Sequence, residues 1–363
     1  MKYIKGYLTA AILLACGWAL TAFTKGHTVL VDMIYPYVSR MAQTFLANWS
    51  GGVDFCLWQA LIFVGIALLL VLVALIIIFK WNPIRWGGWV CAAVAVLIFL
   101  NTCLYGLNKH SGSLPGDIRL QETPYDISEL EAAAAYYRDQ ANEFAGQIPR
   151  TGGGEMVFGT FAELADQAPA GFEVLVYEKS LSVFAGPMGP IKTLDWAKSY
   201  TKRGITGVTV GLTGEACVNP MTPEVLLPFA MCREMCHQAS IAVERDAALG
   251  AYLACINNPD ARFQYSGALM GYRYCLKALE ALEVVSGSGA VDRIRGEEAP
   301  ELTRELAVCD GFLGDRERED AKAYDLLTSW HIQEVVLPGL VEEDSGFDPM
   351  DKTQVDLSDH PDA

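Results

Sequence analysis

The sequence predicts a mainly α-helical membrane protein, in which three amino-terminal transmembrane helices precede an α+β domain outside the membrane. Three uncharged apolar runs lie in the first third of the 363-residue chain, over residues 6–24, 55–79 and 86–108. Each run has about the 20 residues that a helix needs to cross a bilayer. Hydrophobic residues make up 52% of the chain, and their concentration in these runs favours membrane spans over an unusually large core.

Positive charges beside these runs predict the orientation of the chain. Lys2 and Lys5 precede the first run. Lys80 and Arg85 lie in the short loop between the second and third runs. Because lysine and arginine concentrate on the cytoplasmic side, we expect a multi-pass protein of the cell membrane whose carboxy-terminal domain is extracytoplasmic. The first run also fits a cleaved signal peptide, although no clear cleavage site follows it.

Composition divides the chain into four parts. Residues 1–108 form the membrane domain, and a linker punctuated by Pro and Gly follows over 109–125. A folded outer domain is predicted over 126–338, and an acidic, irregular tail over 339–363.

The membrane and outer parts differ in charge. Residues 1–108 carry six Lys or Arg and two Asp, a net charge of +4, so the total of −16 leaves −20 on the remainder. A domain this acidic repels nucleic acid and anionic headgroups, which excludes nucleic acid as a partner. The expected partners are the lipid bilayer around the spans and a peptide or another envelope protein.

The ten cysteines divide into four near the apolar runs and six in the outer domain. Those near the runs, including Cys56, are expected to act as small apolar side chains. The other six match no compact disulfide framework, and a domain of this size does not need one. A single bridge, such as one from Cys217 to a cysteine on a helix, stays open.

Periodicity gives a coarse secondary structure for the outer domain. Asp126 and Glu129 have the spacing of a capping box at the start of a helix. Residues 172–179 and 207–219 alternate in polarity and are rich in β-branched side chains, so both segments are predicted to be strands. Further helices are predicted over 223–254, 263–285 and about 300–337.

The stretch CREMCHQ, residues 232–238, differs by one residue from the zinc-binding motif H-E-x-x-H. In that motif two histidines four residues apart share a helix face and hold zinc, while the glutamate polarises the attacking water. Arg233 stands where the first histidine is expected. Glu234 is therefore the candidate general base, and His237 is the remaining candidate metal ligand.

Other short segments accompany the CREMCHQ stretch. They are Ile205, Gly207, TGEACVN at 213–219, LPF at 227–229, and YLAC at 252–255. With these residues, from about residue 199 to 279, the chain resembles bacterial membrane proteins grouped as domain of unknown function 3810. Segments 265–279 and 347–358 are also similar to the family. Those proteins resemble divergent gluzincin-type zinc metallopeptidases, which implies a zincin-like outer domain at a bacterial cell envelope.

The resemblance implies further site residues. Glu244 and Asp246 correspond to the carboxylates that follow the motif and, if metal is bound, would join His237 in holding it. A strand along a substrate cleft is implied by the TGEACVN segment. Its candidate cleft residues are Thr213, Gly214, Glu215 and Asn219.

The chain departs from the family pattern around the motif. Beside Arg233, the departures are Ser240 for Gly, Asp246 for Glu and Ala248 for Asn. In a straight helix Glu244 would lie about 10 Å along the axis from His237. Glu244 can reach His237 only if the helix breaks, for which Gly at position 240 is better suited than Ser.

Electrostatics also argues against a metal beside Arg233. A guanidinium about 4 Å from a divalent cation costs on the order of 8 kcal/mol at an effective dielectric near 20. The sequence therefore favours a metal-free pseudopeptidase, with no cofactor. In this interpretation Arg233 occupies the place of the metal and pairs with Glu244 or Asp246, and peptides bind by strand addition along 207–219.

Two other functions stay open on the sequence alone. One is an active zinc peptidase in which Cys236, His331 or His110 replaces the missing ligand. The other is a structural membrane protein of the envelope, whose motif helix keeps family residues for packing. Zinc is expected as a cofactor only for the peptidase.

Overall fold

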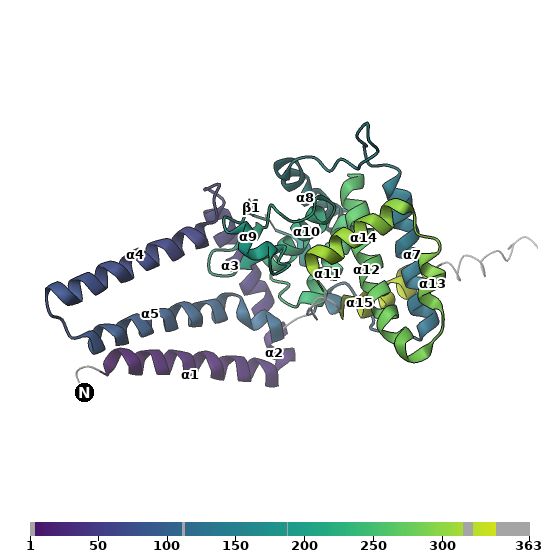
Figure 1. Ribbon diagram of the computed structural model, residues 1–363. Coiled ribbons are helices and arrows are strands. Elements are labelled where there is room, and N and C mark those ends of the chain that lie inside the picture. Colours follow the sequence, from purple (N-terminus) through teal and green to yellow (C-terminus); the bar gives the residue numbers. More distant parts are fainter. Residues whose placement is uncertain (1–3, 111–112, 187, 315–321, 339–363) are drawn as a thin grey trace, which may run out of the picture.

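In the computed structural model, which describes residues 4–110, 113–186, 188–314 and 322–338, three long apolar helices extend from one side of a folded domain (Figure 1). The first packs along the third, and the second diverges from them. Each has 22 residues and is long and apolar enough to cross a membrane. The predicted spans are thus confirmed as candidate membrane helices. They are α1 (Lys5–Gly26), α4 (Leu57–Ile78) and α5 (Pro83–Leu104).

Two helices that the hydropathy runs did not indicate connect α1 to α4. They are α2 (Thr28–Asp32) and α3 (Tyr35–Ser50). Figure 1 shows α3 running across the ends of the spans, between them and the folded domain. One face of α3 is buried there, through Ser39, Gln43, Ala47 and Ser50.

The predicted linker is largely structured where it is described. It contains the end of the 3₁₀ turn η1 (Gly106–His110) and the short helix α6 (Leu114–Asp117). The long helix α7 (Ile127–Ala145) follows. Its amino terminus has both hydrogen bonds of a capping box between Asp126 and Glu129, which confirms the predicted start.

The predicted strand over 172–179 is wrong, because most of that segment is the last part of helix α8 (Phe161–Tyr177). Thr160 and Glu163 form a second capping box, which fixes the start of α8. The side chains of Leu164, Ala168, Phe172 and Leu175 are buried at helical spacing. Burial of this stripe stabilises a helix despite the local β-branched residues.

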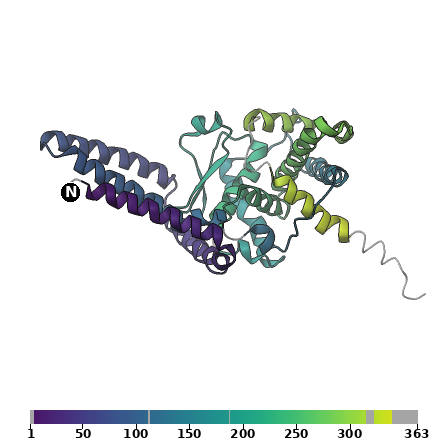
Figure 2. The same cartoon turned by 90° about the horizontal axis from the view of Figure 1, so that it is seen from below.

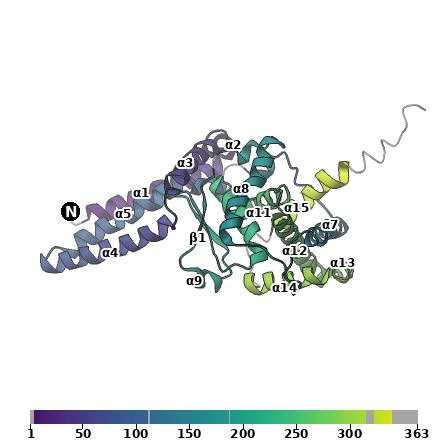
Figure 3. The same cartoon turned by 90° about the horizontal axis from the view of Figure 1, so that it is seen from above.

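A small mixed sheet lies between the candidate spans and the helices of the outer domain (Figures 2 and 3). Its strands are β1 (Ile191–Thr193), β2 (Gly207–Val210) and β3 (Glu215–Val218), in the order β1-β3-β2. β3 pairs parallel to β1 and antiparallel to β2. The predicted strand over 207–219 is therefore a hairpin, with a turn between β2 and β3.

The remaining helices form one hydrophobic core around α10. α10 contacts α8, α11, α12 and the sheet, and α12 packs along α7. The predicted helices over 223–254 and 263–285 are confirmed, the first as two helices. The elements are η2 (Ser182–Phe184), α9 (Ala197–Thr201), η3 (Glu224–Leu226), α10 (Leu227–Gln238), α11 (Glu244–Ile256), α12 (Ala261–Ser286), α13 (Ala290–Arg295), α14 (Pro300–Leu313), α15 (Ala323–His331) and the π-helical turn η5 (Ile332–Val336).

A disulfide between Cys56 and Cys217 joins the residue before α4 to the central strand β3. This corrects the expectation that Cys56 acts only as a small apolar side chain. The two residues are 161 positions apart, so local spacing could not indicate the pair. The predicted acidic tail, 339–363, lies outside the described residues.

Candidate functional site

Helix α10 carries the CREMCHQ residues through the centre of the outer domain. Pro228 lies in its first turn, where the missing amide hydrogen costs no helical hydrogen bond. All twelve residues of α10 are buried. Because Arg233, Glu234 and His237 are buried with it, each of these side chains needs polar partners inside the protein.

The helix breaks directly after the motif. Ser240 has a φ of 72°, in the left-handed region. The amide of Ser240 donates to the carbonyl of His237 at 2.9 Å, and the amide of Ile241 donates to that of Cys236 at 3.0 Å. These two bonds form a Schellman motif with Ser240 at the position that usually holds glycine. The condition for Glu244 to approach His237 is therefore met, although the residue at the break is serine.

The Arg233 guanidinium lies between α10 and the segment that leads into β2. Its Nη2 donates to Thr206 Oγ1 at 3.2 Å and to Glu234 Oε1 at 3.0 Å. The Arg233 and Glu234 side chains are only 8% and 1% exposed. The other carboxylate oxygen of Glu234 accepts from Thr209 Oγ1 at 2.9 Å. Glu234 is thus held by a cation on one oxygen and by a hydroxyl on the other.

His237 is held between a backbone carbonyl and Glu244. Its Nδ1 lies 2.8 Å from the carbonyl oxygen of Ile241, and its Nε2 lies 3.4 Å from Glu244 Oε2. A protonated imidazole satisfies two acceptors because both of its nitrogens then carry hydrogen. The surroundings of His237 therefore favour the imidazolium form.

The charges around this pair move both pKa values. Burial lowers the pKa of His237, but the contact with Glu244 and the charges of Glu234 and Glu244 outweigh burial and raise it. Burial raises the pKa of Glu244, but His237, with smaller effects from Arg233 and Lys109, lowers it to about 2. The two groups are therefore stabilised as an ion pair.

Asp246 points to different partners. Its Oδ2 accepts from the amide of Leu114 at 3.0 Å, and its Oδ1 lies 3.4 Å from Arg245 Nε. Burial raises the pKa of Asp246. The carboxylate thus holds the start of α6 on α11. Of the two carboxylates that the family resemblance implied, the structure brings Glu244 to His237.

The residues around His237 do not fit a zinc ion. Two ligand atoms of one tetrahedral zinc lie roughly 3.3 Å apart, and the separation of 3.4 Å between His237 Nε2 and Glu244 Oε2 is close to this. The third protein ligand of such a site would come from position 233, where the chain has the cationic side chain of Arg233. Within the described parts of the chain, no three His, Cys, Asp or Glu side chains are grouped to hold a metal.

The proposed replacement ligands lie in other surroundings. A side chain at Gly250 would meet Cys236 Sγ at 2.7 Å, so this thiol faces α11. The pKa of the Cys236 thiol is raised well above its ordinary value by burial, which disfavours a thiolate ligand. His331 packs against Tyr136, with ring centroids 5.0 Å apart, and His110 lies in η1.

The four candidate cleft residues have structural partners in the protein. Thr213 and Gly214 form the hairpin turn, where the carbonyl of Gly214 accepts from Gln238 Nε2 at 2.7 Å. Asn219 Nδ2 donates to Thr201 Oγ1 at 2.9 Å and to the carbonyl of Ile205 at 3.1 Å. Their role in a substrate cleft stays a prediction.

The remaining cleft candidate, Glu215, is buried where β3 meets α4. Its two oxygens accept from the amides of Leu57 and Trp58 at 2.7 and 2.9 Å, at the amino terminus of the candidate span. Lys192 Nζ lies 2.7 Å from Glu215 Oε1 and also donates to the carbonyls of Ser50 and Phe55. We call Lys192 and Glu215 the clamp pair. Lys192, Thr206 and Thr209 belong to no recognisable sequence motif, so the sequence analysis did not identify them.

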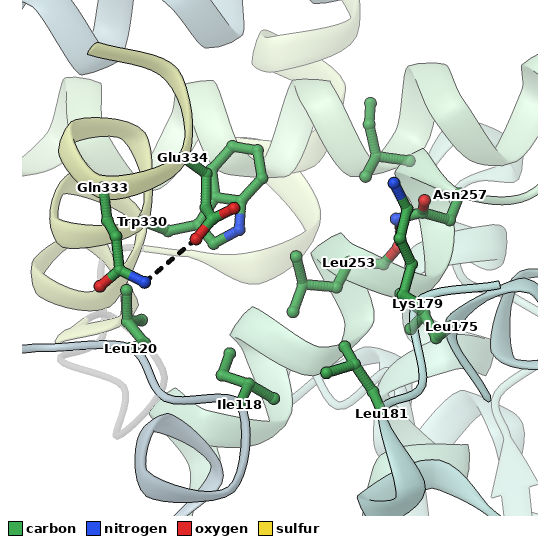
Figure 4. Close-up of a pocket in the computed structure, with 11 residues that line it drawn as sticks. Ile118, Leu120, Leu175, Lys179, Leu181, Leu253, Asn257, Trp330, Gln333 and Glu334 are labelled. Carbon is green, nitrogen blue, oxygen red and sulfur yellow. Dashed lines mark hydrogen bonds between the residues drawn. The ribbon is translucent and has the colours of Figure 1, made fainter. Parts of the chain in front are cut away.

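One cavity lies next to the end of helix α10, and a larger one lies farther from this helix. One of about 20 Å³, roughly the room for one water, is lined by residues including Ser240 and Asp246. Another of about 380 Å³ lies between α8, α11 and α15 (Figure 4). Its lining is mostly apolar, with Lys179 and Glu334 among its charged groups. Neither cavity is lined by Arg233, Glu234 or His237.

The fold and the site define the chain as a mainly helical protein with three candidate membrane spans and a folded domain built around the buried helix α10. A family described as "Protein of unknown function (DUF3810)" matches residues 31–313. The chain belongs to this family, and the match runs from the end of α2 through α3, α4 and α5 into the outer domain, as far as the end of α14. No curated protein and no solved structure matches the chain.

Proposed function

We propose that the protein is a membrane-anchored pseudopeptidase, which binds a peptide or an envelope protein without cleaving it. The position of Arg233 carries this proposal. Its guanidinium stands at the first ligand position and forms an ion pair with Glu234 at 3.0 Å. A general base needs an oxygen that can reach the attacking water, and here Arg233 engages one oxygen of Glu234 while Thr209 engages the other. The missing histidine ligand and the engaged Glu234 carboxylate would both hinder zinc-dependent peptide hydrolysis.

A peptide could add to the sheet beside this site. β3 lies between β1 and β2, so of the segment 207–219 only β2 forms an edge of the sheet. Edge strands bind extended peptides through main-chain hydrogen bonds. The proposed binding surface therefore narrows to the edge of β2, next to Thr209 and Glu234.

The proposal also places the outer domain outside the cytoplasm of a bacterial cell. Lys80 and Arg85, in the loop between α4 and α5, favour a cytoplasmic position for that loop. The bond between Cys56 and Cys217 supports the same orientation, because disulfides persist in oxidising compartments. Digestion of the outer domain by protease added to intact spheroplasts would test it.

Metal analysis of the full chain, purified in detergent, tests the loss of the zinc site. We expect far less than one zinc per chain. Arg233→His should bind zinc measurably, since two histidines and Glu244 would then form a known ligand set. Arg233→Gln is the matched control, because it removes the cation without adding an imidazole. One zinc per wild-type chain that is lost in His237→Ala would instead support a zinc peptidase with altered ligands.

Proline substitution tests binding at the β2 edge. In an edge strand, neighbouring amides point alternately toward the sheet and away from it. Val208→Pro and Thr209→Pro therefore separate two effects, since one removes a bond to β3 and the other removes an outward donor. We expect the variant that keeps the wild-type melting temperature to bind a library of extended peptides at least about tenfold more weakly. Equal binding by that variant and the wild type would favour a structural role.

A further inference from the structure

Helices α2 and α3 expose a continuous stripe of apolar side chains. On α3 the stripe follows intervals of one, three and four residues, which keep it on one helix face. Its members are large and at least half exposed, and the stripe extends back into α2. The residues are Tyr37 (67%), Val38 (51%), Met41 (73%), Phe45 (70%) and Trp49 (64%), preceded by Val29, Met33 and Ile34.

The opposite face fixes the orientation of α3. Ser39 Oγ donates to the carbonyl of Leu104, the last residue of α5, at 2.8 Å. Gln43 Nε2 donates to the carbonyl of Gly211, in the hairpin turn, at 2.9 Å. A side chain at Gly214 would lie 2.6 Å from the amide nitrogen of Ala47, so the turn packs directly on α3. The stripe therefore cannot turn inward without breaking these contacts.

The location of α3 indicates which partner meets the stripe. The helix runs from near the ends of α1 and α5 to near the start of α4, across the direction of the spans (Figures 1 and 3). Phe55, which is 50% exposed, continues the apolar surface toward α4. The stripe is thus continuous with surfaces that lipid covers in a spanning bundle.

The chemistry of α3 suits a lipid–water interface. The helix contains no acidic residue and one basic residue, Arg40, whereas the outer part of the chain is strongly acidic. Tyr37 and Trp49 stand near its two ends, and such amphipathic rings favour the headgroup level of a bilayer. We propose that α3 lies in the membrane interface on the side of the outer domain, with the stripe inserted among the lipids.

This arrangement would hold the motif helix at a fixed height above the membrane. Ser39 Oγ on α3 lies 3.3 Å from Ser240 Oγ, directly after α10. The same helix supports the hairpin turn that follows β2. The outer domain would therefore rest on the bilayer through α3 as well as through its covalent link to the spans.

Photo-crosslinking tests this placement in the full chain. Benzoylphenylalanine is introduced at Phe45 or, in a second variant, at Met41. The protein is reconstituted in vesicles of phosphatidylethanolamine and phosphatidylglycerol and irradiated, and its peptides are analysed by mass spectrometry. Leu70, 65% exposed on α4, is the lipid-facing reference, and Tyr177, 82% exposed on α8, is the water-facing control.

We expect phospholipid adducts at position 45 or 41 with a yield within about threefold of position 70, and at least about tenfold above position 177. A yield at both stripe positions as low as that at position 177 would overturn the proposal. Cross-links from the stripe mainly to a second copy of the chain would also overturn it, because the stripe would then be a protein interface.

Discussion

Two buried cation–carboxylate pairs in the outer domain are built in different ways. The clamp pair, Lys192 and Glu215, comes from two strands and holds the first amides of α4. Arg233 and Glu234 are neighbours on one helix, and their hydroxyl partners, Thr206 and Thr209, lie in and just before β2. The clamp pair joins distant parts of the chain, whereas the Arg233 pair neutralises charge within one site.

The two pairs therefore differ in how much of the fold depends on them. Both pairs bury charge at a large desolvation cost, which only many hydrogen bonds can offset. For the clamp pair, those bonds connect the sheet to the candidate spans. For Arg233, they join the guanidinium to Glu234 on the same helix and to Thr206 beside β2. Substitution should therefore harm the fold more at the clamp pair than at Arg233.

The largest expected effect is at the clamp pair. Glu215→Ala leaves the buried Lys192 ammonium unpaired and the first amides of α4 uncapped. We expect the free energy of unfolding to fall by about 3–5 kcal/mol, as measured by chemical unfolding in detergent. Glu173→Ala, at an exposed position of α8, is the matched control and should change little. A loss below about 1 kcal/mol for Glu215→Ala would show that the clamp pair contributes little.

A smaller loss of stability is expected for Gly207→Ala, where β2 packs against Glu234. A side chain at Gly207 would lie 2.5 Å from Glu234 Cγ, so Gly207→Ala forces the strand and the carboxylate apart. We expect a destabilisation of about 1–3 kcal/mol, seen as a lower melting temperature. Gly152→Ala is the matched control, because an added side chain there meets nothing within 4 Å. Equal melting temperatures for the two variants would contradict the close packing at Glu234.

The His237–Glu244 pair should make a still smaller, pH-dependent contribution, because the Glu244 side chain is 32% exposed and solvent screens the pair. The raised pKa of His237 adds stability below its ordinary pKa of 6.5, and this is lost as pH rises through the folded value. The lowered pKa of Glu244 adds stability above its ordinary 4.5, which is lost as pH falls toward about 2. The contribution is thus complete between these ordinary values.

Thermal melts across pH measure this contribution as a difference. Glu244→Gln and His237→Gln should each lose stability relative to wild type, most strongly between pH 4.5 and 6.5. The difference should shrink at higher and at lower pH. A constant difference over the whole range would mean that packing, and not the ion pair, explains the loss.

The smallest expected effect is a gain at the helix break. Ser240→Gly relieves the positive φ but removes the hydroxyl contact with Ser39. A left-handed residue other than glycine costs about 1–2 kcal/mol, so we expect a net gain of up to about 1 kcal/mol. Ser240→Ala loses the hydroxyl and keeps the unfavourable φ, so it should be less stable than wild type. If both variants had the same stability, backbone strain at this position would be ruled out as the cause.

The spans and the capping box of α7 were predictable because hydropathy runs and cap spacing are local signals. The prediction of a strand over 172–179 was wrong because it also relied on a local signal. Its β-branched residues are local, whereas the burial of Leu164, Ala168, Phe172 and Leu175 that makes α8 a helix depends on the rest of the core. Helix α3 was missed because its length and mixed polarity match neither a span nor a strand.

The candidate site was predictable only in part. The motif spacing identified Arg233, Glu234 and His237, and the resemblance indicated Glu244. The hydroxyl partners and the clamp pair depend on how β2 and β3 pack against α10 and α4, which the sequence does not encode as spacing. Asp246 supports α6, and its part in any metal site stays a prediction.

The bond between Cys56 and Cys217 can form only after a long stretch of the chain has been synthesised. The ribosome adds about 5–20 residues per second, so the 161 residues between the two cysteines take roughly 10–30 seconds to make. Cys56 cannot pair with Cys217 before that interval has passed, so α4 and α5 are synthesised before the bond can close. Closing the bond then fixes the central strand of the outer domain to the start of α4, after the candidate spans have been made.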